Sequence, residues 1–138
     1  MKKPEKRFHK RTDEELTDFI KKLELQAVET AEERLPLYLK VGVKDAHLIL
    51  DVGCGSGFVT RDIARLTKGT VIAIDGSDSL LTVAQRILSN YINITLCKAD
   101  AQQLCFADNT FDLVTCNLLL MWTDDPQTVV DEMTRVTK

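Results

Sequence analysis

Three glycines on alternate residues, in the run Asp51-Val-Gly53-Cys-Gly55-Ser-Gly57, constrain this chain more than any other feature. They follow a short apolar run, residues 47–52, and precede a pattern of apolar residues typical of a helix. Glycine permits backbone angles closed to other residues, and its missing Cβ lets a ligand lie against the main chain. A loop of this kind between a strand and a helix is typical of α/β folds that bind a ligand beyond the strand's carboxyl end.

The rest of the chain alternates between apolar runs with the length of buried strands and helical patterns. Strands are expected over residues 47–52, 70–74, 92–97 and 111–116. Helical patterns follow the first, second and fourth strands, and the last of them starts at Asp125-Pro126, an aspartate N-cap with proline at N1. The alternation predicts an α/β fold with four parallel strands, helices on both faces and right-handed crossovers.

The segment before the first strand predicts a helical cap. Thr12 and Glu15 have the spacing of a capping box, and an apolar stripe follows them. Pro36 is expected to end or kink this first helix, because proline lacks the N–H that the helix needs. A short second helix over residues 37–41 is expected to stop at Gly42.

Length and charge bound the organisation of the chain. The 138 residues suffice for one domain with one core. We expect a basic, disordered tail over residues 1–11, with an arm for an acidic partner as the alternative, a helical cap over 12–45 and a ligand-binding domain over 46–138. The net charge of −3 gives no footprint for nucleic acid. No apolar run has transmembrane length and no signal peptide opens the chain, so a cytoplasmic protein without membrane contact is expected.

The cysteines and histidines give no sign of a metal site. None of the four cysteines forms a CxxC pair, and the two histidines stand apart from each other. Structural zinc is therefore not expected, and reduced, buried thiols are the simplest interpretation. Cys54 is expected to be a small residue of the loop rather than a nucleophile, because no histidine or second cysteine accompanies it.

Two classes of nucleotide site compete for the glycine loop. A dinucleotide-binding GxGxxG motif needs a third glycine, but Phe58 or Thr60 stands there, depending on the starting glycine. A P-loop needs a lysine after its last glycine, and none follows. What remains is a D-x-G-x-G-x-G arrangement, with Asp75 at the end of the second strand and Asp100 after the third. The alternatives are that Asp75 is only a helix N-cap and that Asp100 only caps the turn before residue 111.

These segments resemble a known family. Residues 48–57 resemble the first S-adenosylmethionine (SAM) binding motif of class I, Rossmann-like methyltransferases, residues 74–81 resemble the segment that follows it, and residues 100–114 are similar to the third cofactor segment. The resemblance covers residues 46–138, and the N-terminal helices resemble the family's variable cap. It implies a Rossmann-like fold and a SAM-dependent methyltransferase whose cofactor product is S-adenosylhomocysteine.

The resemblance implies cofactor contacts at the loop and at the strand ends. Around the methionine part of SAM, Asp51 would order the loop and help hold the amino group, and the loop itself would supply Gly53, Cys54, Gly55 and Gly57. Around the nucleoside, Asp75 would hold both ribose hydroxyls, Asp100 would accept from the adenine amino group, and the remaining contacts would come from Gly76, Leu80 and the Ala101 N–H. Gly76 departs from the family, which often has a larger apolar residue there. Asn117 is either a cofactor or acceptor contact or a loop residue.

The acceptor site is less defined. Leu118, Met121 and Trp122 are candidates for an acceptor pocket, with core packing as the alternative. Residues 117–120, Asn-Leu-Leu-Leu, differ from the Asn-Pro-Pro-Tyr type of amino-methylating enzymes, which with the acidic pI of about 5.4 favours a small-molecule acceptor. A nucleotide-binding oxidoreductase is a weaker alternative, because the GxGxxG motif fails.

The sequence stops at Lys138, after the helix that follows the fourth strand, whereas the family continues with a fifth strand and an antiparallel pair. We therefore expect the fourth strand to be a sheet edge, covered by a homodimer or by a partner chain. The alternative function is a catalytically silent SAM-binding subunit, or a truncated isoform, that acts through a partner chain.

Overall fold

A parallel four-stranded sheet forms the centre of the computed structural model, which describes residues 11–138, so that the predicted tail falls almost wholly outside the described residues. The sheet has the order β3-β2-β1-β4 and consists of β1 (Leu48–Val52), β2 (Thr70–Asp75), β3 (Ile94–Lys98) and β4 (Leu113–Cys116). The predicted parallel α/β sheet of four strands is confirmed. The third and fourth strands begin two residues later than predicted, and Ile92, which precedes β3, is fully exposed.

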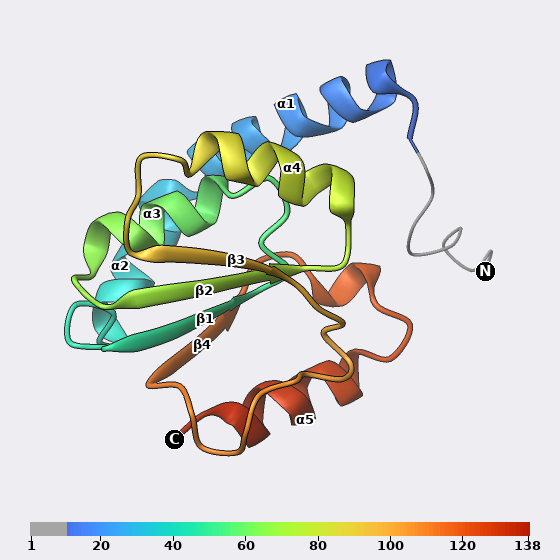
Figure 1. Ribbon diagram of the computed structural model, residues 1–138. Coiled ribbons are helices and arrows are strands. Elements are labelled where there is room, and N and C mark those ends of the chain that lie inside the picture. Colours follow the sequence, from blue (N-terminus) through green and yellow to red (C-terminus); the bar gives the residue numbers. More distant parts are fainter. Residues whose placement is uncertain (1–10) are drawn as a thin grey trace.

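Helices cover both faces of the sheet, as predicted (Figure 1). One face carries α3 (Phe58–Leu66) and α4 (Asp78–Ile87), and the cap helices α1 (Asp13–Glu29) and α2 (Ala31–Lys40) pack on α3. The other face carries α5 (Pro126–Val136), which a 3-10 turn, η1 (Leu120–Trp122), precedes. Asp125 caps α5 by accepting from the Thr128 N–H at 3.1 Å, so the predicted start of this helix is confirmed.

The cap helices break at a different residue from the one predicted. The capping box of Thr12 and Glu15 is present, but α1 ends at Glu29, and Pro36 lies inside α2. Thr30 marks the break, where its hydroxyl and its N–H both donate to the Gln26 carbonyl. Pro36 is exposed, so water can replace the hydrogen bond that its ring removes from α2.

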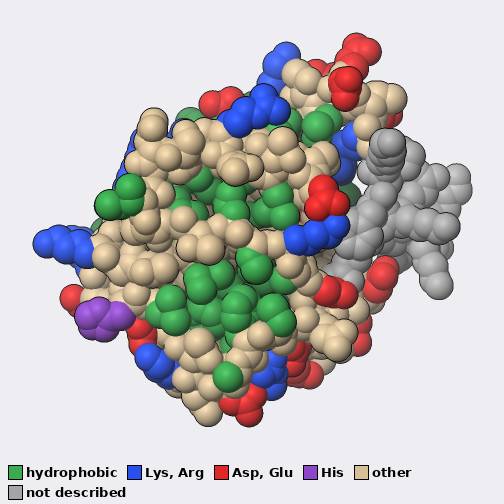
Figure 2. All heavy atoms as spheres, viewed as in Figure 1, with side chains coloured by type: hydrophobic (Ala, Val, Ile, Leu, Met, Phe, Trp, Pro, Cys, Tyr) green, Lys and Arg blue, Asp and Glu red, His purple; other side chains and the backbone are tan. Residues whose placement is uncertain are grey.

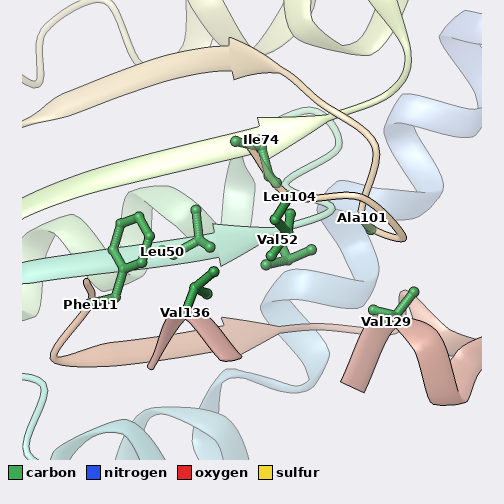
Figure 3. Close-up of a cluster of buried hydrophobic side chains, with 8 residues drawn as sticks. All are labelled: Leu50, Val52, Ile74, Ala101, Leu104, Phe111, Val129 and Val136. Carbon is green, nitrogen blue, oxygen red and sulfur yellow. The ribbon is translucent and has the colours of Figure 1, made fainter. Parts of the chain in front are cut away.

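Alternate residues of β1 face two separate cores, because successive side chains of a strand point to opposite faces. Leu50 and Val52 belong to the cluster beneath α5 (Figure 3), whereas Ile49 belongs to the cluster beneath α2 and α3. Both clusters bury their β1 residues completely, which explains the continuous apolar run in the sequence. Hydrophobic side chains also reach the surface between β3 and α5 (Figure 2).

Candidate functional site

The glycine loop is fastened to the carboxyl end of β2. The N–H groups of Gly53 and Cys54 both donate to the Ile74 carbonyl, at 2.8 and 2.9 Å, and the Gly55 N–H donates to the Asp75 carboxylate at 2.9 Å. The loop therefore has one defined path across the ends of two neighbouring strands. This position, past the carboxyl ends of parallel strands, is where open α/β sheets bind their ligands.

Two of the glycines have left-handed backbone angles, which favour glycine, and leucine side chains pack close to both. Gly53 has φ +74°, and a Cβ there would lie 2.7 Å from a methyl group of Leu119. Gly57 has φ +90°, and a Cβ there would lie 2.8 Å from a methyl group of Leu88. Leu118, which precedes Leu119, is itself left-handed with φ +55°, a costly conformation for a leucine that turns the chain toward the loop.

A cavity of about 1010 Å³ lies next to the loop and collects nearly all of the predicted site residues. It is large enough for a nucleotide-sized cofactor together with a second small molecule. Gly57 does not line it, because that residue faces Leu88 behind the loop. The predicted residues that do line it are Asp51, Gly53, Cys54, Gly55, Asp75, Gly76, Leu80, Asp100, Ala101 and Asn117.

Asp51 is a buried carboxylate in the wall of this cavity. Its side chain accepts one hydrogen bond, from the Thr60 hydroxyl at 2.7 Å, and its residue is 2% exposed. Burial raises the pKa of Asp51 to about 6 and outweighs the Thr60 hydrogen bond, which lowers it, while the charge of Asp75 raises it further. A cationic group of a ligand would relieve this cost, because a buried charge needs a partner.

Asp75 holds the loop and also faces the cavity. One carboxylate oxygen accepts from Gly55, and the other accepts from the Ser77 N–H at 2.8 Å. The N-cap of α4 is Ser77, whose hydroxyl accepts from the Leu80 N–H, so the alternative in which Asp75 is that N-cap is wrong. Each oxygen has a second lone pair with which it can accept from a ligand hydroxyl.

Asp100 and Ala101 continue β3 into a turn. The Asp100 carboxylate accepts from the Gln102 N–H at 2.9 Å, so Asp100 does cap a turn, but it is the one that begins at Asp100 itself. Ala101 is buried, and its methyl group packs in the core cluster beneath the sheet (Figure 3). Its backbone therefore remains as the part that faces the cavity.

Asn117 lies directly after β4 and lines the cavity. Its side chain makes no hydrogen bond with any other part of residues 11–138. The amide therefore has both donor and acceptor groups available for a ligand.

The cavity has two further walls. The first wall consists of Leu118, Met121 and Trp122, for which the sequence allowed either core packing or an acceptor pocket. These residues are 40%, 64% and 57% exposed. The second wall is one face of α1, whose individual residues sequence reasoning did not name: Phe19, Lys22, Leu23, Gln26 and Ala27. Their helical spacing was the available signal, but the same spacing is typical of a helix that packs on a core.

Residues 11–138 contain neither a candidate metal site nor a membrane-spanning helix. No group of three or more histidine, cysteine, aspartate or glutamate side chains in this range is arranged to hold a metal ion. No helix in the same range has the length and apolar character needed to cross a bilayer.

The methyltransferase domain family matches residues 50–138, and the chain belongs to this family. The chain is 33% identical over 102 residues to the ubiquinone/menaquinone biosynthesis C-methyltransferase of Saccharophagus degradans, covering 70% of this chain and 41% of that relative. The chain thus spans well under half the length of that curated relative. SAM is the cofactor of the family, as the resemblance implied.

Solved structures have the same fold. A SAM-dependent methyltransferase of Aquifex aeolicus matches 94% of this chain and 69% of its own, with a TM-score of 0.71 and 24% identity. The chain seen in complex with the Trm112 methyltransferase activator of Haloferax volcanii matches 94% of this chain and 57% of its own, with a TM-score of 0.77 and 23% identity. Both likenesses support the Rossmann-like fold.

Proposed function

We propose that this chain binds SAM in the cavity beside the glycine loop and transfers its methyl group to a small-molecule acceptor. The observation that carries the proposal is the pair of carboxylates, Asp51 and Asp75, on either side of a loop fastened to β2. Asp51 suits the amino group of the methionine part, and Asp75 suits the two ribose hydroxyls. Asp100 and the backbone of Ala101 suit the adenine ring, which Leu80 flanks.

Methyl transfer needs close, aligned reactants in a site that excludes water. When bound, SAM would supply an electrophilic sulfonium methyl group for transfer to the acceptor. The apolar wall of Leu118, Met121 and Trp122 suits this step, because the positive charge of the sulfonium is lost as the bond breaks. The space between this wall and α1 suits a small acceptor.

Calorimetric titration with SAM, S-adenosylhomocysteine and NAD tests the proposal. We expect binding of the first two and not of NAD. Asp75→Asn is expected to weaken SAM binding about ten- to hundredfold, because charge-assisted hydrogen bonds are lost. Asp45→Asn is the matched control, because Asp45 is exposed and lies outside the cavity. Wild-type protein that fails to bind SAM would contradict the proposal.

A second candidate is a SAM-binding subunit that acts through a partner chain or a second copy. Within the described residues β4 pairs only with β1. One isolated bridge, between Phe111 and Thr137, lies just before the first residue of β4. The fold relative in complex with the Trm112 activator supports this alternative. Methyl-transfer assays with and without a candidate partner distinguish the two, since a silent subunit is active only with its partner.

A cytoplasmic location is supported by the four free cysteines.

A further inference from the structure

The cavity extends past the residues proposed for SAM and along α1. Phe19, Lys22, Leu23 and Gln26 line it at spacings of three and four, so they share one face of the helix. Residues of η1, Met121 and Trp122, line the same cavity as this face of α1. The extension is therefore a compartment between the cap and η1, with aromatic side chains from both: Phe19 and Trp122.

The α1 wall of this compartment carries charge opposite to that of the cofactor end. Acidic side chains surround the glycine loop and Asp124 lies beside η1, whereas the α1 side carries Lys22 and Arg11. Neither cation has an ion pair with a carboxylate of residues 11–138, while Lys98, also in the cavity wall, is paired with Asp78 at 2.6 Å. The Arg11 guanidinium lies 4.0 Å from the centre of the Phe19 ring, which holds this charge over the aromatic face.

We infer that the acceptor is a flat, apolar ring system that carries an anionic group. The ring of Trp122 and the side chain of Met121 suit the ring system, and Lys22 and Arg11, the second of which Phe19 holds in place, suit the anion. The inference rests on the proposed function, because it assigns this compartment to the methyl acceptor. Lys22 is the central residue, since it is the charged side chain on the cavity face of α1.

A pair of fluorescent probes with one ring body tests the anion. 8-Anilinonaphthalene-1-sulfonate carries an anionic group, and N-phenyl-1-naphthylamine lacks it. Both are titrated into wild-type protein and into Lys22→Gln, Trp122→Ala and Lys21→Gln. Lys21 is the matched control, because it neighbours Lys22 on the same helix and does not line the cavity. SAM binding is measured separately on each protein by calorimetry.

We expect the anionic probe to bind wild-type protein more tightly than the neutral one. Lys22→Gln should weaken the anionic probe about tenfold and leave the neutral probe unchanged, Trp122→Ala should weaken both, and Lys21→Gln should behave as wild type. Equal effects of Lys22→Gln and Lys21→Gln, equal binding of the two probes, or no effect of Trp122→Ala would overturn the inference. If SAM binds and the probes show one of these results, the inference alone fails, whereas absence of SAM binding removes the proposed function itself.

Discussion

Asp51 shows how a residue that suits a ligand can lower the stability of the folded state. It is almost completely buried, accepts one hydrogen bond from Thr60 and lies near a second carboxylate, Asp75. An ordinary aspartate has a pKa of 3.8, and that of Asp51 is raised to about 6, so the folded state disfavours the ionised form. The cost of ionisation is therefore absent below about pH 4, grows between pH 4 and 6, and is complete above pH 6.

Replacing Asp51 by asparagine should stabilise the protein at neutral pH. We expect Asp51→Asn to raise the free energy of unfolding by about 2 kcal/mol at pH 7.5 and to change it little at pH 4, because only the ionised form carries the cost. Urea denaturation at the two pH values measures this. In the wild-type protein, SAM binding should strengthen between pH 5 and 7 as Asp51 ionises. Asp51→Asn should weaken SAM binding and remove this pH dependence. A stability change of equal size at both pH values would disprove the account.

At the scale of elements, a buried ion pair joins the cap to the fold beneath it. Arg34 of α2 pairs with Asp62 of α3 at 3.0 Å and also donates to the Ala27 carbonyl at the end of α1. The two paired side chains are only 7% and 17% exposed. Since α3 begins directly after the glycine loop and α1 forms a wall of the cavity, this pair fixes the two walls relative to each other.

Arg34→Ala should lower the free energy of unfolding by about 3 kcal/mol, because it leaves the carboxylate of Asp62 buried without its partner. Urea denaturation measures the loss. The double variant Arg34→Met, Asp62→Leu is the control, because it removes both charges while keeping apolar volume. It should recover most of the stability, and a double variant no more stable than Arg34→Ala would show that packing rather than charge accounts for the loss.

For the molecule as a whole, the main feature is that β4 is an edge strand of the sheet within the described residues. In the described residues β4 pairs with β1 on one side. On the chain segment just before β4, Phe111 forms a bridge with Thr137. The last described residues thus run parallel to the start of β4, in the place that a further strand would occupy. Backbone groups of an unpaired strand are a ready template for another chain.

We therefore predict that the chain associates with itself in solution. Sedimentation velocity over a range of concentrations should give a mass that rises above the 15.5 kDa of one chain. The Cys105→Ser variant, kept under reducing conditions, is the control that removes disulfide cross-linking through this exposed thiol. A constant mass of one chain at every concentration would contradict the prediction.

Much of the fold and of the candidate site follows from patterns within a few residues. The glycine loop, the acids after two strands, the capping box at Thr12 and the start of α5 at Pro126 depend on backbone angles and hydrogen bonds between near neighbours. These are physical requirements that local sequence expresses directly. The same reasoning placed all but one of the predicted cofactor residues at the cavity, although their contacts with SAM stay predictions.

Tertiary structure decided the rest, because it depends on contacts between residues far apart in the chain. The approach of Leu119 to Gly53, the position of Gly57 against Leu88 and the cavity face of α1 have no local signature. An apolar stripe on a helix predicts that this face is shielded from water. Only the tertiary packing determines whether it packs on the protein core or lines a ligand cavity. The sequence alone therefore determined the glycine loop and its acids, and only the folded chain determined the compartment beside them.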